Sequence, residues 1–123
     1  GELYFADGHP SFSVMEERDR RLVPVYDFDT PKERPLEFAE ETTYTGDPTI
    51  MTNRATREWI HSLSSIFGAL IDAGMEITMF REHEVLPWRG IKLLVPATAR
   101  LWRLPDCHPR MPLSFSLRAR KRP

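Results

Sequence analysis

Proline is the residue that most constrains this chain. Eleven prolines are spread from Pro10 to Pro123. Because proline fixes φ, lacks a backbone N–H and interrupts helices, this spacing divides the chain into short extended pieces. We therefore expect several short strands joined by turns, and an all-helical fold is disfavoured.

Length and charge limit the classes of protein that this chain can represent. The 123 residues have room for one domain, and the net charge of -1 provides no electrostatic footprint for nucleic acid. The single cysteine, Cys107, cannot form an internal disulfide or a thiolate metal site. No segment resembles a signal peptide or has the length and apolar character of a membrane span. We expect a cytoplasmic protein without a nucleic-acid or membrane partner.

Two stretches in the first half favour extended structure. Residues 1–6 form a mostly apolar run closed by Asp7-Gly8, which predicts a buried strand ending in a turn. Residues 22–45 predict a hairpin insertion outside the main sheet, because Pro24 disfavours a central strand. The acidic residues of this stretch lack convergent spacing, so they predict a solvated face and no metal site. They are Asp27, Asp29, Glu33, Glu37, Glu40 and Glu41.

The clearest helical pattern lies in residues 62–73. Its apolar positions follow the helical repeat and predict one buried stripe, formed by Leu63, Ile66, Phe67, Leu70 and Ile71. Ser62 can cap the first turn, and Gly74 stands where a left-handed residue would end the helix.

Two strands and a connecting segment are predicted after this helix. Residues 75–80 alternate in part, and residues 113–120 alternate apolar and polar side chains, so we expect the latter to pair beside 75–82. The intervening residues 87–112 are too apolar for a plain solvent loop of this length. They predict a cap-like insertion that folds back on the domain.

Several phrases resemble the C-terminal half of class I S-adenosylmethionine-dependent methyltransferases. They are residues 59–63 (WIHSL), 69–74 (ALIDAG), 82–84 (EHE) and 86–88 (LPW), together with 1–6 and 112–121 at the two ends. The resemblance implies an α/β fold, the C-terminal portion of a Rossmann-like sheet with one parallel strand, a helix and an antiparallel strand pair. Residues 1–123 would be the second half of one methyltransferase domain, with insertions at 22–45 and 87–112.

The resemblance implies S-adenosylmethionine as cofactor, but the sequence lacks a motif to bind it. The six glycines are scattered, and no glycine-rich loop follows a strand. Gly1 resembles the second glycine of the turn before the family's fifth strand, so we expect a segment of a longer protein. We assign no cofactor-binding residue here and expect the isolated chain to be inactive.

The segment is expected to supply the acceptor side of the pocket. Methyl transfer is an in-line displacement that needs a general base only when the acceptor loses a proton. His61, where the resemblance also places a histidine, and His9, after the first strand, are the candidate catalytic residues. Tyr44, Trp59 and Trp88 are candidate walls of a substrate pocket. Structural roles for these histidines and aromatic residues stay open at this level.

Two functions from different classes follow. The first is a methyltransferase segment whose parent enzyme methylates a small molecule, with the acceptor and the methylated atom left open. The second is a non-catalytic binding or dimerisation module, in which an exposed sheet edge is covered by another copy.

Overall fold

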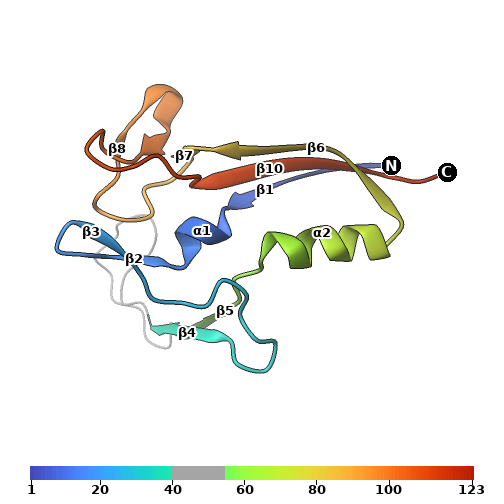
Figure 1. Cartoon of the computed structure of the whole chain (residues 1–123), viewed down its shortest axis with the longest axis horizontal. Helices are drawn as coiled ribbons and strands as arrows, with labels where there is room; N and C mark the ends of the chain where they lie inside the picture. The colour runs from blue at the N-terminus through green and yellow to red at the C-terminus, as the bar shows by residue number, and fades with distance from the viewer. Residues whose placement is uncertain (40–54) are drawn as a thin grey trace.

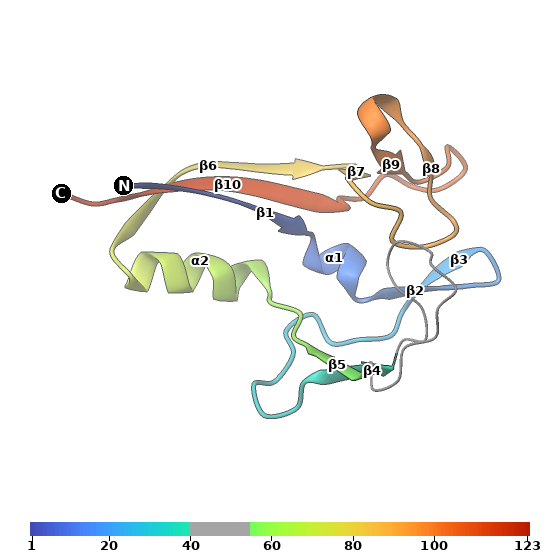
Figure 2. The same ribbon diagram turned by 180° about the vertical axis from the view of Figure 1, so that it is seen from behind.

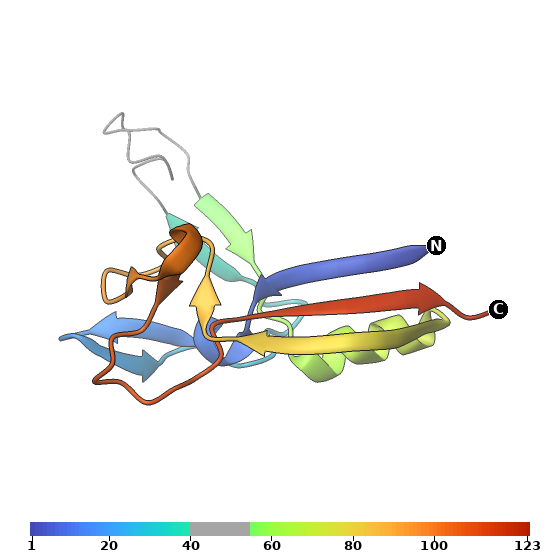
Figure 3. The same ribbon diagram turned by 90° about the horizontal axis from the view of Figure 1, so that it is seen from above.

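Three strands form the main sheet of the molecule. The computed structural model describes residues 1–39 and 55–123. Strands β1 (Glu2–Gly8), β10 (Ser114–Lys121) and β6 (Met75–His83) lie side by side in that order (Figure 3). Both pairings are antiparallel, with Leu117 of β10 opposite Phe5 on one side and Phe80 on the other. The predicted pairing of 113–120 beside 75–82 is confirmed.

Helix α2 (Leu63–Asp72) lies along one face of this sheet (Figure 1). The Ser62 hydroxyl accepts a hydrogen bond from the Ser65 N–H at 3.1 Å, which satisfies a free donor of the first turn. Gly74 follows the helix with a φ of +79°, a conformation that residues with a Cβ adopt at a cost. The predicted helix at 62–73 and both of its ends are therefore confirmed.

The interface between α2 and the sheet forms one hydrophobic core. Phe115, Leu117 and Ala119 of β10 are buried beneath the helix, whose Leu63, Ile66, Phe67 and Leu70 pack on them. Ile71, expected in the same stripe, remains 57% exposed. At 3.6 residues per turn it lies about 80° around the helix from Leu63, at the flank of the stripe. The apolar stripe is thus one residue narrower than the spacing predicts.

Aromatic rings connect the strands of this core. The Phe115 ring centroid lies 5.8 Å from that of Phe5 on β1 and 5.8 Å from that of Phe80 on β6. Phe80 in turn meets Phe67 of α2 edge to face, with 5.0 Å between ring centroids. Such tilted and edge-on contacts are the favoured geometries for aromatic pairs, so Phe115 joins all parts of the main layer.

Two antiparallel ladders lie away from the main sheet (Figure 2). The short helix α1 (Pro10–Ser13) leads into β2 (Met15–Arg18), which pairs with β3 (Arg21–Pro24). The two residues between these strands, Asp19 and Arg20, both have positive φ, as a tight hairpin turn requires. β4 (Leu36–Ala39) pairs with β5 (Ala55–Glu58).

A third small sheet packs on a second hydrophobic core. Strands β7 (Val85–Leu86), β9 (Trp102–Arg103) and β8 (Val95–Pro96) lie in that order, and the 3₁₀ turn η1 (Thr98–Arg100) connects β8 to β9. Leu86, Leu94 and Leu113 are fully buried beneath Phe12, Ile91 and Trp102, among others. Residues 87–112 therefore fold back onto β7 and contribute to a core of their own.

The predicted fold class is wrong. In the described part of the chain all strand pairings are antiparallel, the strands divide among four small sheets, and α1 and α2 are the α-helices. This arrangement differs from a Rossmann-like α/β sheet with a parallel strand. The physical reason is that alternation of apolar and polar residues predicts a strand but does not determine which strand pairs with it. Here β10 lies between β1 and β6 and pairs antiparallel with both.

The predicted hairpin at 22–45 also differs from what is observed. The two strands that fall within this range pair outside it, β3 with β2 and β4 with β5. Residues 40–45 of the range lie outside the described residues. In the described part of the chain, no helix combines the length and apolar character needed to cross a membrane.

Candidate functional site: an aromatic cleft beside the end of β1

A cleft of about 1110 Å³ opens where β1, α1 and the segment leading into α2 meet. Phe115 and Leu86 line it although they are almost completely buried, so they form its floor. Trp59, His61 and Trp88, three of the residues singled out in the sequence, line it as well. The volume is slightly above the roughly 300–1,000 Å³ typical of ligand sites, which is enough for a small organic molecule.

The wall that carries Trp59 and His61 is held by a loop from the first half of the chain. The Thr30 N–H donates to the Ile60 carbonyl at 2.8 Å, and the Ile60 N–H donates back to the Thr30 hydroxyl at 2.9 Å. The Trp59 indole N–H donates to the carbonyl of Lys32 at 3.2 Å. These bonds fix the backbone between the two side chains and orient the indole.

Asp29 secures the start of α2 and acts on His61. Its carboxylate accepts from the Ser62 N–H at 3.2 Å and from the Ser65 hydroxyl at 3.1 Å. The Ser62 backbone bond, followed by the Ser65 and Ser62 side chains and the nearby charge of His61, lowers the pKa of Asp29. Sequence reasoning placed Asp29 among solvated carboxylates. No local motif indicates this role, because Asp29 lies more than thirty residues before Ser62 and Ser65 in the sequence.

Another wall comes from the loop after β7. Trp88 is half exposed on it, and Gly90 passes close enough that an added Cβ would lie 3.5 Å from the Trp88 indole nitrogen. Arg89 also lines the cleft. Its guanidinium lies 5.2 Å from the centre of the Trp102 ring and donates to the Lys92 carbonyl at 2.7 Å. The guanidinium of Arg89 is therefore held in place by the Trp102 ring and the Lys92 carbonyl.

His9 does not line the cleft, although Gly8 and Pro10 on either side of it do. Its side chain is 4% exposed. Nδ1 accepts from the Ser11 N–H at 3.0 Å and caps α1, and Nε2 lies 2.6 Å from the Glu82 carboxylate. This network assigns the proton to Nε2, which donates to Glu82. Both ring nitrogens are thus engaged in the protein interior.

Two further aromatic positions complete the comparison with the predicted site. Tyr44 lies outside the described residues. Tyr26, which sequence reasoning did not single out, lines the cleft. Its hydroxyl donates to Glu16, an interaction that lowers the pKa of Glu16 and raises that of Tyr26. A phenol held in this way serves as a wall of the cleft, and its proton is less available than that of an ordinary tyrosine.

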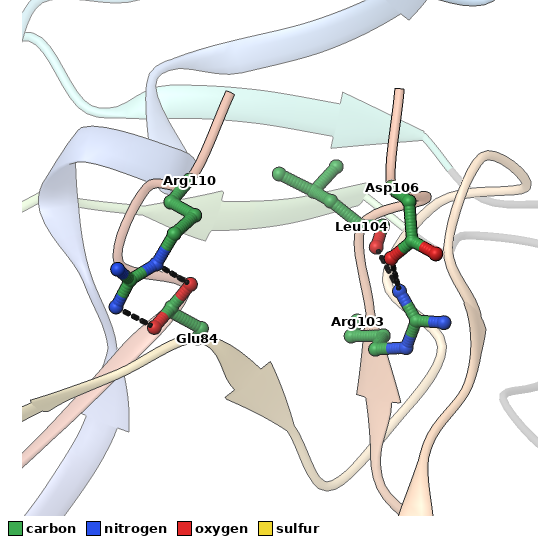
Figure 4. A network of polar contacts seen from close by, with 5 residues as sticks. All are labelled: Glu84, Arg103, Leu104, Asp106 and Arg110. Atoms are coloured by element: carbon green, nitrogen blue, oxygen red, sulfur yellow. Dashed lines mark hydrogen bonds and ion pairs between the residues drawn. The ribbon is translucent and has the colours of Figure 1, made fainter. Parts of the chain in front are cut away.

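A smaller polar pocket of about 320 Å³ lies beside the third sheet. Figure 4 shows its two ion pairs, a double contact between Arg110 and Glu84 at 2.7 and 2.8 Å and a contact from Arg103 to Asp106 at 2.8 Å. The Arg110 contact lowers the pKa of Glu84 and raises that of Arg110. Within these two pairs, each charge is matched by its partner.

An apolar groove of about 380 Å³ runs between β1 and α2. Leu3 and Phe5 line it from the strand, and Ile66, Ala69 and Leu70 line it from the helix. β1 is the outer strand of its sheet. One of its edges pairs with β10, and its other edge has no paired strand among the described residues.

The described residues provide no recognisable place for a metal or for S-adenosylmethionine. Within residues 1–39 and 55–123 no three His, Cys, Asp or Glu side chains are grouped to hold a metal ion. At the end of β1 the Gly8 N–H donates to Asp7 and the His9 N–H to Leu113, so these donors are occupied. Gly8 and Gly90, which line the cleft, come from separate segments and form no phosphate- or ribose-binding loop. The residues at hand do not fit the cofactor.

Comparison of the chain with protein-family models, with curated proteins and with solved structures finds no match. The geometry of the cleft and the motifs in the sequence are therefore the features that indicate its function.

Proposed function

We propose that the cleft binds a small organic molecule that accepts a methyl group, and that this chain supplies the acceptor side of an S-adenosylmethionine-dependent methyltransferase. The observation that supports this proposal is the convergence of Trp59, His61 and Trp88 on one cleft. These side chains come from the phrases that resemble the methyltransferase family. The proposal assigns no cofactor contact to the chain, because its described residues do not fit the cofactor.

The chemistry that this assigns to the chain is limited to binding and proton transfer. Trp59 and Trp88 cover the acceptor and exclude water, and the buried floor at Phe115 and Leu86 limits its depth. His61 is exposed at the cleft, and an imidazole there can act as the general base that takes the proton an acceptor oxygen or nitrogen loses. Asp29 lies close enough to His61 for the two side chains to interact electrostatically.

The experiment uses the protein translated from the complete reading frame that contains this sequence. It is incubated with methyl-labelled S-adenosylmethionine and a small-molecule extract, and transfer of label is measured. We expect transfer, with a rate at least about tenfold lower in His61→Asn, as for loss of a general base. His108→Asn, on the far pocket beside the third sheet, is the matched control and leaves the rate unchanged. If calorimetry shows no binding of S-adenosylmethionine and no label is transferred, the proposal is contradicted.

A second candidate function is a non-catalytic module that pairs with another copy. It is favoured by the outer edge of β1 together with the apolar groove between β1 and α2. Its test is the molar mass in solution by light scattering. A dimer that Leu3→Lys converts to monomer supports it, because Leu3 lines the apolar groove and a lysine there would place a charge in the interface. Tyr4→Lys is the control, because adjacent strand residues face opposite sides of the sheet and Tyr4 does not line the groove. A monomer in the unsubstituted chain contradicts it.

A further inference from the structure

Aromatic side chains form a substantial part of the cleft lining. Six line it: Phe5, Phe12, Tyr26, Trp59, Trp88 and Phe115. Two of these are partly in contact with solvent, with Trp59 41% and Trp88 50% exposed. Exposure of the apolar indole surface to water is unfavourable. A flat apolar ligand that covers the indoles removes this surface from water, which favours binding. The Trp59 ring is already oriented by its bond to the Lys32 carbonyl, so a ligand would not have to order it.

The two arginines that line the cleft differ in whether a carboxylate pairs with them. Arg57 lines it, but its guanidinium lies 3.6 Å from the Glu37 carboxylate. Arg89 contacts a carbonyl oxygen and the Trp102 ring, and neither group carries a formal negative charge. Within the described residues, the guanidinium of Arg89 is thus held in place without an ion-pair partner, as a group that recognises an anion would be.

The carboxylates of the cleft lie on other segments. Asp7 is at the end of β1, where one of its oxygens accepts from the Gly8 N–H, and Glu58 is at the end of β5. Both would repel an anion placed beside them. They therefore direct a negatively charged group of the ligand to the loop of Arg89 and away from β1 and β5.

We infer that the ligand of this cleft is a planar aromatic acid, whose ring lies against the indoles of Trp59 and Trp88 and whose anionic group pairs with Arg89. The inference rests on the proposed function, because it takes the cleft to be the site where the methyl acceptor binds. It adds the chemical class of the acceptor. The aromatic ring is recognised by stacking, and the acid by a cation that the protein holds in place before binding.

Three probes separate the elements of this inference. They are 2-naphthoate, a planar anion; decalin-2-carboxylate, a saturated anion of similar size; and N-methylquinolinium, a planar cation. Each is titrated into the ¹⁵N-labelled chain while the indole N–H signals of Trp59 and Trp88 are followed by NMR. We expect 2-naphthoate to shift both signals and to bind about tenfold more tightly than either other probe.

Matched variants test the anion contact. Arg89→Gln should weaken 2-naphthoate binding by about tenfold, and Arg89→Lys should retain part of the affinity. Arg34→Gln is the control and should change it less than about twofold, because Arg34 is exposed and does not line the cleft. Both substituted positions are exposed, and the backbone NMR spectrum reports whether each variant keeps its fold.

The outcomes that overturn the inference are specific. Equal affinity for decalin-2-carboxylate removes the aromatic requirement, and tighter binding of N-methylquinolinium identifies an aromatic cage for a cation instead. Absence of 2-naphthoate binding contradicts the inference outright. Because this titration needs no S-adenosylmethionine, failure of methyl transfer with naphthoate binding intact contradicts only the proposed reaction. Methyl transfer to a non-aromatic acceptor contradicts only the aromatic class.

Discussion

His9 and Glu82 are 73 residues apart in sequence, and their side chains meet at 2.6 Å between Nε2 and Oε2. His9 is buried and its other nitrogen caps α1, while Glu82 is half exposed on β6. The pair therefore connects the loop after β1 to the far edge strand of the same sheet. Phe115 of the central strand lies between them in the order of the sheet, and its ring meets the imidazole edge to face at 6.2 Å.

Replacing His9 should destabilise the protein through the cap and the buried pair. We expect His9→Ala to lower the free energy of unfolding by about 1–2 kcal/mol, as for loss of an N-cap acceptor. His9→Asn retains a capping acceptor and should lose less, and Glu82→Gln keeps an acceptor for Nε2 and should also lose less. Urea denaturation followed by circular dichroism measures all three. A His9→Ala protein as stable as the original would show that the cap contributes nothing.

Asp29 should make stability depend on pH in the acid range. Its pKa is lowered in the folded state by the Ser62 backbone bond, so its contribution is complete above its unfolded pKa, near 3.8. The contribution is lost as the pH falls through the lower folded value. Asp29→Asn should therefore reduce the thermal midpoint at pH 7, and the difference from the original should shrink below pH 3.8. Asp27→Asn, an exposed neighbour, is the control. A difference that is constant with pH contradicts this role.

Phe115 should be the most sensitive position of the main core. It is 1% exposed and contacts the rings of Phe5 and Phe80. Phe115→Ala should lower the free energy of unfolding by about 3–5 kcal/mol, because it removes apolar burial and leaves a cavity. Tyr4→Ala on β1, where the side chain is 61% exposed, should change it far less. Chemical denaturation of both variants tests the comparison, and similar losses would place the core elsewhere.

Two glycines near α2 should respond to alanine with opposite signs. Gly74 has a φ of +79°, so Gly74→Ala should destabilise the protein by about 1–2 kcal/mol. Gly68 lies inside α2, and a Cβ built there meets nothing within 4 Å. Gly68→Ala should stabilise the protein by about 0.5–1 kcal/mol, because glycine is entropically unfavourable in a helix. Thermal midpoints measure both, and changes of the same sign would contradict the assignment of the helix end.

The candidate site could be predicted only in part. Trp59, His61 and Trp88 were selected from sequence phrases and do line one cleft, because two of them precede the same capped helix and the third follows the next long strand. His9 was selected by the same reasoning, but its side chain turns to Glu82 and the Ser11 N–H. No local sequence pattern indicates a role for Arg89 or Asp29. The groups that position them, Trp102 for Arg89 and Ser62 for Asp29, are distant in sequence.

The sequence by itself determined the features that depend on neighbours along the chain. The helix at 62–73, its serine cap, its terminating glycine and the alternation of 113–120 follow from bonds and periodicities that span a few residues. Only the tertiary structure decided which strands became neighbours, so that β10 lies between β1 and β6 and the pairing is antiparallel instead of Rossmann-like. The physical reason is that a strand's pattern records which of its faces is buried, while the identity and direction of its partner depend on packing among segments that are far apart in the chain.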